Sequence, residues 1–375
     1  MACATCYHRL MSATRRAFLA TLATSALHAE LEKGKSFPSE WKLYSDPATE
    51  FDVYRLTGPA NSSHLPAYYN RALSRHSGFL LFSSDRTGSN QAFRMDLKSG
   101  DCRQLTRAQE LDIASPALLP DDRAFCAFDG PSLRQYSIAN LRDREVYRVP
   151  EGWTRGPGAS VTGDGVSAIL SEVSEQGSRL RLINVVKGAA TTVIETAFPA
   201  AHPIARPRRA QILYRQGDEA LWLVNFDGKQ NRRLKTAQDG AIGPAFWAPN
   251  GRTVLYLHIP ADKSKLVAIR EHTPDENVDK SLSTTSQFAH FGSNGDASVF
   301  VGASRNRNSP HILILLRLTR RELTLCEHRC SDPTTVAPIF SPDSQRVFFQ
   351  TDRDGKPAIY RVQVERFVEK TESEA

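Results

Sequence analysis

The sequence predicts an all-β fold, a single seven-bladed β-propeller closed by its N-terminal strand, and three observations support this prediction. One strand-turn-strand pattern recurs seven times between about residue 78 and the C-terminus. The copies start about 42 to 48 residues apart, which is the spacing of four-stranded propeller blades. The last copy stops after its third strand, and the start of the chain can supply the fourth. A stacked solenoid is the alternative, but it does not account for that truncation.

Each copy has an apolar strand, a turn rich in Asp, Gly, Asn or Ser, and a second strand that leads through a short charged hairpin into a third. The clearest copy is residues 78–106 (GFLLFSSDRTGSNQAFRMDLKSGDCRQLT). The other copies begin near Arg123, Val166, Gln211, Thr253, Ser298 and Arg346. Several follow a turn phrase such as FSPDS at 340–344, in which Pro fixes φ and the next residues tolerate a turn.

Residues 51–57 (FDVYRLT) alternate apolar and polar side chains, as a strand with one buried face should. If this strand completes the last blade, the ring closes and no long sheet edge remains free. We therefore expect one propeller over 45–366, a polar lead-in at 30–44 and a charged tail at 367–375. The tail is expected to be solvated and disordered.

The composition is that of a globular protein, with 40% hydrophobic and 24% charged residues among 375. The formal net charge is +7, from 48 basic and 41 acidic residues. Residues 1–29 hold three arginines and no acid, and Arg15-Arg16 is followed by a short apolar run and small residues, a pattern typical of a twin-arginine export signal. The alternative is a frayed N-terminal helix. Removal of this segment leaves 45 basic and 41 acidic residues, a net charge of +4.

No later stretch reaches the roughly 18 apolar residues that a membrane helix needs. We expect a periplasmic or secreted protein without a membrane span. Cys3 and Cys6 belong to the predicted leader. In an oxidising compartment Cys326 and Cys330 could pair, whereas a zinc site lacks a second ligand pair of suitable spacing.

Several enzyme classes lack their signature. The chain has no G-x-S-x-G and no hydrolase domain after the propeller, which argues against a prolyl oligopeptidase. It has neither a P-loop nor a G-x-G-x-x-G after a strand, which argues against nucleotide use. A modest net charge without a nucleic-acid-binding module argues against a nucleic-acid partner.

The repeats resemble TolB-type and WD-type propellers, and more specifically the oligogalacturonate lyase family. The most specific phrase is residues 201–207 (AHPIARP), which is similar to the G-H-P-x-x-R-P of that family. Further phrases lie at 54–57, 63–64, 68–70 and 81–85 in the first part of the chain, and at 221–225, 325–328, 338–343 and 355–360 after it. The resemblance thus covers most of the chain after residue 50.

The resemblance implies β-elimination on uronate oligosaccharides. A base removes the proton on C5, next to the carboxylate, and the glycosidic oxygen on C4 leaves. Because that proton is very weakly acidic while the carboxylate is charged, a positive group must stabilise the enolate-like transition state. In the family a divalent metal, typically manganese, has this role, and a histidine acts as base, as suits an imidazole near neutral pH.

Carried over residue by residue, the resemblance makes His202 the catalytic base and Arg206 a partner for a uronate carboxylate. It also points to His64, Gln287 and His290 as substrate-binding residues. Two simpler interpretations remain open. His202 before Pro203 can be a hydrogen-bonded turn residue, and the arginines at 206, 208 and 209 can belong to a solvated loop.

The metal ligands of the family have no match. Pro244 stands where the family has the histidine of H-E-F-W. At 332–340, Thr335 and Ala337 replace both histidines of Q-x-x-H-P-H-P-x-F, and Asp332 replaces its glutamine. We therefore expect no metal and no other cofactor at the positions that bind the metal in the family.

Manganese binding then requires an alternative cluster, for which the sequence offers Asp332, Gln287, His290 and His202.

Two functions follow from these patterns. The first is an exported lyase-like protein that cleaves, or at least binds, acidic pectin fragments, with which a modest positive charge agrees. The second is a non-catalytic TolB-like propeller that binds a protein or a glycan in the cell envelope, since fold alone does not assign function.

Overall fold

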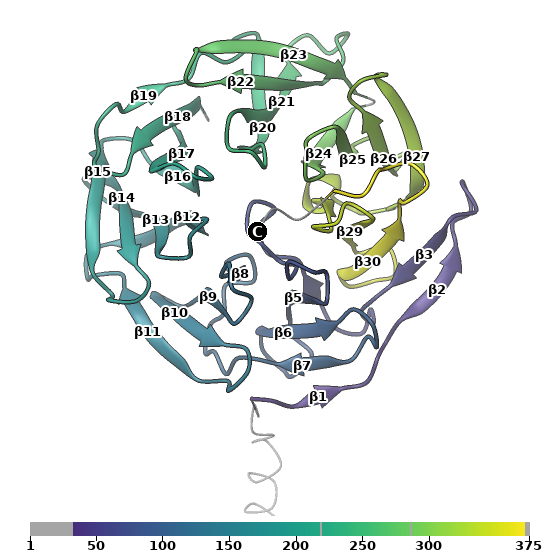
Figure 1. Ribbon diagram of the computed structural model, residues 1–375, viewed down its shortest axis with the longest axis horizontal. Coiled ribbons are helices and arrows are strands. Elements are labelled where there is room, and N and C mark those ends of the chain that lie inside the picture. Colours follow the sequence, from purple (N-terminus) through teal and green to yellow (C-terminus); the bar gives the residue numbers. More distant parts are fainter. Residues whose placement is uncertain (1–32, 218–219, 286, 372–375) are drawn as a thin grey trace, which may run out of the picture.

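The computed structural model describes residues 33–217, 220–285 and 287–371, so the predicted leader at 1–29 lies outside the described residues. The described part contains thirty strands and one short 3-10 helix, η1 (Pro333–Thr335). The strands form seven sheets, which stand as blades around a common axis (Figure 1). The predicted seven-bladed β-propeller is confirmed.

The first three blades run in chain order from the innermost strand outwards. Blade 1 consists of β4 (Ser63–His64), β5 (Phe79–Ser84), β6 (Gln91–Asp96) and β7 (Cys102–Gln104), with β1 (Ser36–Phe37) on its outer edge. Blade 2 consists of β8 (Ala117–Leu118), β9 (Ala124–Asp129), β10 (Ser132–Ser137) and β11 (Asp143–Arg148). Blade 3 consists of β12 (Thr154–Val161), β13 (Ser167–Ser174), β14 (Gly177–Asn184) and β15 (Ala190–Thr196).

The next three blades repeat this order. Blade 4 consists of β16 (Ala200–Ala205), β17 (Gln211–Gln216), β18 (Ala220–Asn225) and β19 (Arg232–Arg233). Blade 5 consists of β20 (Gly240–Trp247), β21 (Val254–Pro260), β22 (Ala268–Thr273) and β23 (Val278–Thr284). Blade 6 consists of β24 (Phe288–Ser293), β25 (Val299–Ser304), β26 (His311–Leu316) and β27 (Arg321–Glu327).

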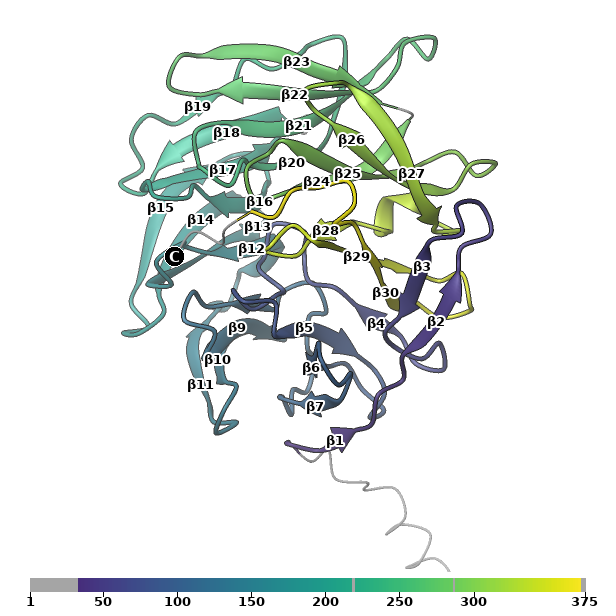
Figure 2. The ribbon, with the colours of Figure 1, turned by 45° about the vertical axis from the view of Figure 1, so that its right-hand side comes forward.

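Blade 7 joins the two ends of the chain. It consists of β28 (Ile339–Phe340), β29 (Arg346–Thr351), β30 (Ala358–Gln363), β3 (Asp52–Arg55) and β2 (Lys42–Ser45). β3 pairs antiparallel with β30, with Val53 opposite Val362, and Figure 2 shows β2 and β3 beside β30 at the rim. The N-terminal strand therefore closes the ring, as the sequence predicts.

The flanking segments are more ordered than expected. In the lead-in, β1 adds to blade 1 and β2 adds to blade 7. The tail is anchored as far as Thr371, whose hydroxyl bonds that of Ser344. Val368 is buried, and the ring of Phe367 lies 5.5 Å from that of Phe51. Two apolar side chains among the charges of the tail account for this anchoring.

Seven hydrophobic clusters make up the core, one between each pair of neighbouring blades. β5 illustrates the reason. Leu80 and Phe82 pack towards blade 7, while Phe79 and Leu81 pack towards blade 2, because successive side chains of a strand point to opposite faces. The centre of the ring is therefore left for other residues.

The four described cysteines, Cys102, Cys126, Cys326 and Cys330, are buried free thiols. The expected pairing of Cys326 with Cys330 is thus not formed. Cys326 belongs to β27 and lies in the core between blades 6 and 7, whereas the thiol of Cys330 lies 3.6 Å from the hydroxyl of Thr335. Burial raises the pKa of the Cys326 thiol.

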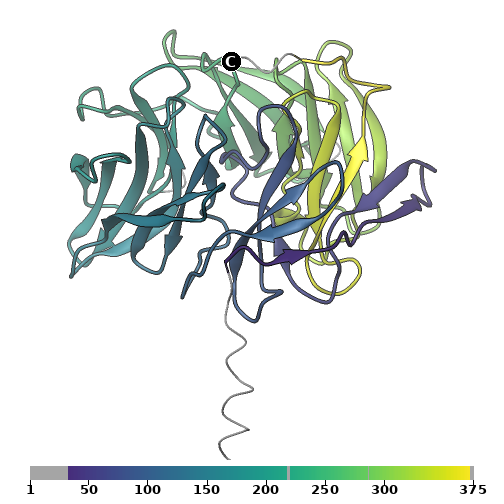
Figure 3. The ribbon, with the colours of Figure 1, turned by 60° about the horizontal axis from the view of Figure 1, so that its bottom comes forward.

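The propeller has two faces, seen from the side in Figure 3. On one face the inner strand of each blade turns into the second strand; we call it the turn face. Its turns are residues 74–78, 119–123, 162–166, 206–210, 248–252, 294–298 and 341–345. On the opposite face, the connecting face, the outer strand of one blade leads into the inner strand of the next. The described residues include no helix long and apolar enough to cross a membrane.

Closure of the ring should be a main source of stability. Val53 is fully buried in β3, so Val53→Asp places an unpaired charge in the core of blade 7 and should cost more than about 3 kcal/mol. Asp52→Ala changes the exposed neighbour on the same strand and should stay within about 0.5 kcal/mol. Urea unfolding measures both, and equal stability of the two variants would contradict the closing role of β3.

Candidate functional site

The centre of the ring is crossed by a short segment of blade 1. Residues 65–71 leave the inner strand after β4, and the strand resumes where Leu73 bridges Leu80. The hydroxyl of Tyr68 donates to the carbonyl of Ala245 at 3.1 Å and accepts from its N–H at 3.2 Å. Because Ala245 belongs to blade 5, on the other side of the ring, Tyr68 spans the channel.

Tyr69 extends in the same way to His202 of blade 4. Its hydroxyl lies 3.3 Å from Nδ1 of His202, within hydrogen-bonding distance. A Cβ on Gly158 would lie 2.4 Å from that hydroxyl and 2.9 Å from Cα of His202, and Gly158 has a φ of 79°. Only glycine fits at position 158 without displacing Tyr69 or His202. Blade 3 therefore packs directly against the contact between these two side chains.

His202 lies in a β-bulge, where the register of β16 against β17 shifts between Ala201 and Ile204. Its φ is 49°, in the left-handed region, where histidine is several-fold enriched among the few non-glycine residues. Such conformations cluster at functional sites, since the surrounding structure must enforce them. The interpretation of His202 as a simple turn residue does not describe this position.

Neighbouring inner strands have bulges in corresponding positions. The register shifts between Arg155 and Ala159 in β12, between Ile242 and Ala245 in β20 and between Phe288 and His290 in β24. Three of the four bulges contain proline, namely Pro157, Pro203 and Pro244. Proline is suited to a bulge because the unpaired residue needs no ladder N–H. Four adjacent blades thus interrupt their inner strands at the level of His202.

The two tyrosines remain neutral phenols at physiological pH. Burial raises the pKa of Tyr69, and Tyr68 and Asp112 add to the shift, while the positive charges of Arg155 and Arg215 oppose it. Burial likewise raises the pKa of Tyr68, opposed by Arg215. Arg155 forms an ion pair with Asp112.

Arg215 lies between blades 4 and 5. In the pairing of β16 with β17, Arg215 stands opposite Ala201, and Ala201 is the residue that precedes His202. Its guanidinium donates to the carbonyl of Ile242 at 3.2 Å and to the carbonyl of Gly243. Gly243 precedes Pro244, so a fixed positive charge lies beside the position where the resemblance leads one to expect a metal-ligating histidine.

His290 lies on the other side of Tyr68. The two rings meet edge to face with centroids 4.5 Å apart. The histidine is buried, its Nδ1 has no hydrogen-bond partner among the described residues, and burial lowers its pKa to about 4. The structure therefore links His202, Tyr69, Tyr68 and His290 in one row through the channel.

The remaining residues predicted for the site are not part of this row. His64 lies in β4, where burial lowers its pKa and Asp85 opposes the shift. Gln287 precedes β24 with a φ of 63°. Asp332 caps η1, where its carboxylate accepts from the N–H of Thr334 at 3.0 Å.

These residues do not fit a manganese ion. In the described ranges, no three His, Cys, Asp or Glu side chains gather closely enough to hold a metal. Pro244 and Ala337 carry no donor atom in their side chains, and the carboxylate of Asp332 is used by its own turn. Carboxylate and carbonyl oxygens are the protein ligands that suit manganese, and the side chains of Pro244, Thr335 and Ala337 supply neither.

Arg206 is also distant from the row. The four residues from His202 to Arg206 span about 13 Å along a strand, and Arg206 lies at the turn face. Its side chain is 1% exposed, forms a bidentate pair with Asp275 at 3.0 Å and donates to the carbonyl of Gly251 at 2.7 Å. Its guanidinium also covers the ring of Trp247 at 4.7 Å. All three partners belong to blade 5, so Arg206 fastens blade 4 to blade 5.

Residue-by-residue transfer from the resemblance missed Tyr69 and Arg215 as site residues. One signal was available for the first: fourteen residues separate β4 from β5, whereas the other inner strands turn after about five. A length difference of this kind indicates an insertion into the inner strand. No comparable signal marks Arg215, because its role depends on the neighbouring blade.

The contacts of Arg206 predict a structural role. Arg206→Lys keeps the charge but loses the bidentate pair and the stacking on Trp247, and should cost about 1–3 kcal/mol of unfolding free energy. Arg209→Lys alters a 59% exposed arginine that pairs with the same Asp275, and should cost less than about 0.5 kcal/mol. Thermal or urea unfolding compares the stabilities of the two variants. If both lose the same free energy of unfolding, the structural role of Arg206 is contradicted, and Arg206 is again a candidate for binding substrate.

Comparisons with known proteins agree with the fold and with the resemblance. A family model described as oligogalacturonate lyase matches residues 31–175, a range that ends before His202. An oligogalacturonide lyase of Pectobacterium atrosepticum is 25% identical over 384 residues, covering 89% of this chain and 98% of its own. An oligogalacturonate lyase of Dickeya dadantii is 25% identical with the same coverage.

Solved structures of the same kind share the architecture. An oligogalacturonate lyase in complex with manganese superposes with a TM-score of 0.84 at 24% identity, over 89% of this chain and 98% of its own. The oligogalacturonate lyase of Vibrio parahaemolyticus superposes with a TM-score of 0.83 at 22% identity, over 89% and 99%. This chain is a seven-bladed propeller, and its sequence is similar to those of oligogalacturonate lyases along nearly their whole length.

Proposed function

We propose that this chain is an exported lyase that cleaves pectin-derived oligogalacturonides by β-elimination, with His202 as the base. The observation that carries the proposal is the contact between His202 and Tyr69 in the centre of the ring. Relatives of nearly the same length are lyases of this name. That this chain acts on the same kind of substrate is part of the proposal.

In this proposal His202 is the base and Tyr69 is the acid. When Nδ1–H of His202 donates to the oxygen of Tyr69, Nε2 keeps its lone pair and can take the proton from C5. The electron pair of that bond forms the C4–C5 double bond as the bond from C4 to the glycosidic oxygen breaks. Tyr69, protonated because burial raises its pKa, gives its proton to the leaving oxygen.

Arg215 provides the positive charge for the uronate carboxylate. Its guanidinium donates to two carbonyls of blade 5. Its positive charge opposes the rise in pKa that burial causes in both tyrosines. A charge fixed in a water-poor site stabilises a developing enolate-like anion without reorganisation. In this proposal Arg215 takes over charge neutralisation, so the reaction requires no manganese.

Export completes the proposal. Arg15-Arg16 and the apolar run after it support the twin-arginine route to the periplasm or the medium. An extracytoplasmic lyase would meet pectin fragments before they enter the cell.

The assay is the rise in absorbance of unsaturated product when trigalacturonate is added to chelator-treated protein. Wild type should be active without added metal. His202→Asn should lower kcat/KM by about 100-fold or more, since general-base catalysis contributes about that factor, and asparagine tolerates the positive φ of this position. His76→Asn, at an exposed histidine of the turn face, should keep full activity.

A second variant, Arg215→Met, should lower kcat/KM by about 100-fold with the fold intact by circular dichroism. Activity that appears only when manganese is added would refute the role of Arg215. An unchanged rate in His202→Asn would refute the base.

The alternative function is a non-catalytic, TolB-like propeller that binds a protein or glycan in the cell envelope. The replacement of three family ligand positions by Pro244, Thr335 and Ala337 favours it. A rise in melting temperature with trigalacturonate but no product at any metal concentration would support glycan binding. Recovery of one stoichiometric protein partner from cell-envelope extract, with no change in melting temperature on addition of saccharide, would support protein binding.

A further inference from the structure

The mouth of the channel at the turn face contains two adjoining cavities, of about 240 and 400 Å³. Both are lined by Asn70, Arg71, Pro249 and Pro342, so the two cavities meet at these residues. Tyr68 lines the smaller cavity and Tyr69 the larger. The hydroxyls of these tyrosines are bonded to Ala245 and His202, so the two tyrosines form the floor of the mouth.

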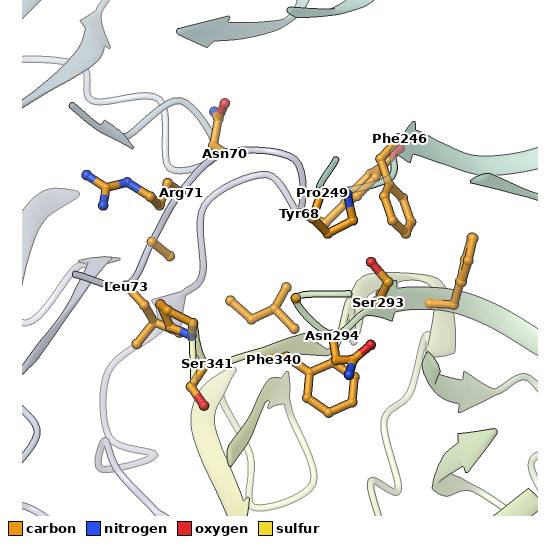
Figure 4. Close-up of a pocket in the computed structure, with 16 residues that line it drawn as sticks. Tyr68, Asn70, Arg71, Leu73, Phe246, Pro249, Ser293, Asn294, Phe340 and Ser341 are labelled. Carbon is orange, nitrogen blue, oxygen red and sulfur yellow. The ribbon is translucent and has the colours of Figure 1, made fainter. Parts of the chain in front are cut away.

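The smaller cavity has aromatic walls. Tyr68, Phe246, Phe291 and Phe340 line it, together with the polar side chains of Ser293, Asn294 and Ser341. Figure 4 shows Tyr68 and Phe246 across from Asn294 and Phe340. Apolar walls with a few placed polar groups are typical of sites for small molecules.

The larger cavity is cationic. Among the residues that the structure describes, Arg71 and Arg75 are the charged ones that line it, and no acidic residue does. Arg71 is paired with Asp122 at 2.7 Å. The backbone N–H of Arg75 donates to the same carboxylate at 2.9 Å. The guanidinium of Arg75 forms no ion pair with the acidic side chains of the described ranges, so its positive charge is available to a ligand.

Asn70 stands where the two cavities meet. It is only 8% exposed, and neither atom of its carboxamide has a hydrogen-bond partner in the described part of the protein. In Figure 4 its side chain and that of Arg71 extend away from the middle of the smaller cavity. A buried polar group without a partner is unfavourable, and a ligand in the mouth can supply that partner.

We propose that the turn-face mouth binds a single sugar acid, a uronate monosaccharide. The pyranose ring lies against the aromatic side chains of the smaller cavity, while the carboxylate lies in the larger one, where it pairs with Arg75 and accepts from the amide of Asn70. The lack of acidic lining selects for an anion, and the aromatic walls select for a ring. This site is separate from the proposed base of the lyase reaction, because His202 lines neither cavity and Tyr69 lies between the larger cavity and that histidine.

Isothermal titration of the full chain with galacturonate tests the site, with galactose as the ligand that lacks the carboxylate. Galacturonate should bind, and galactose should bind at least about tenfold more weakly. Asn70→Leu removes an unpartnered amide at nearly constant volume, so it should leave the melting temperature unchanged or raise it while weakening galacturonate at least about tenfold. Arg75→Gln should weaken binding similarly, whereas Arg123→Gln, at an exposed arginine outside the cavities, should not.

Each result decides for or against the site. No heat with galacturonate, or equal affinity for galactose, would overturn it. Binding that persists in Asn70→Leu and Arg75→Gln but is lost in His202→Asn would place the sugar at the lyase site instead. Loss of lyase activity is a different failure, since the His202→Asn variant should cleave trigalacturonate about 100-fold less efficiently or worse and still bind galacturonate at the mouth.

Discussion

The arrangement at the centre of this protein depends on one segment of blade 1 that crosses the ring. Tyr68 uses its hydroxyl as both donor and acceptor towards the backbone of Ala245, and this fixes the neighbouring Tyr69 against His202. Because the core lies between blades and not on the axis, the channel would otherwise have no internal support. The segment therefore holds the site together and separates the two faces of the propeller.

The charge pattern of the channel follows from that constraint. The positive charge of Arg215 is held beside Gly243, next to a proline that cannot bind a metal. This charge lowers the pKa of the two buried tyrosines, Tyr68 and Tyr69, against the larger effect of burial. A guanidinium differs from a divalent ion in that it contributes a fixed charge and hydrogen bonds but no exchangeable ligand positions. Under the proposed function, this chain shares its fold with a manganese-bound oligogalacturonate lyase but neutralises the carboxylate with arginine.

The ring could be predicted from the sequence because its signals are local. Alternation of side chains in 51–57 predicted a strand, which the structure contains as β3 with Val53 buried, and the start of the first repeat at Gly78 lies one residue before β5. The site could be predicted only in part. Tyr69 and His202 are 133 residues apart, so their contact requires the closed ring. The phrase that contains His202 and Arg206 runs along a strand, which separates these two residues by about 13 Å.

The central claim is that Tyr69 positions His202 and donates the proton to the leaving group. Its most direct test is the initial rate of unsaturated product from trigalacturonate with chelator-treated Tyr69→Phe, measured from pH 5 to 9 beside wild type. The account predicts a fall in kcat of about 100-fold or more and a changed pH profile, with the melting temperature little altered. Wild-type rates and an unchanged profile in Tyr69→Phe would contradict it.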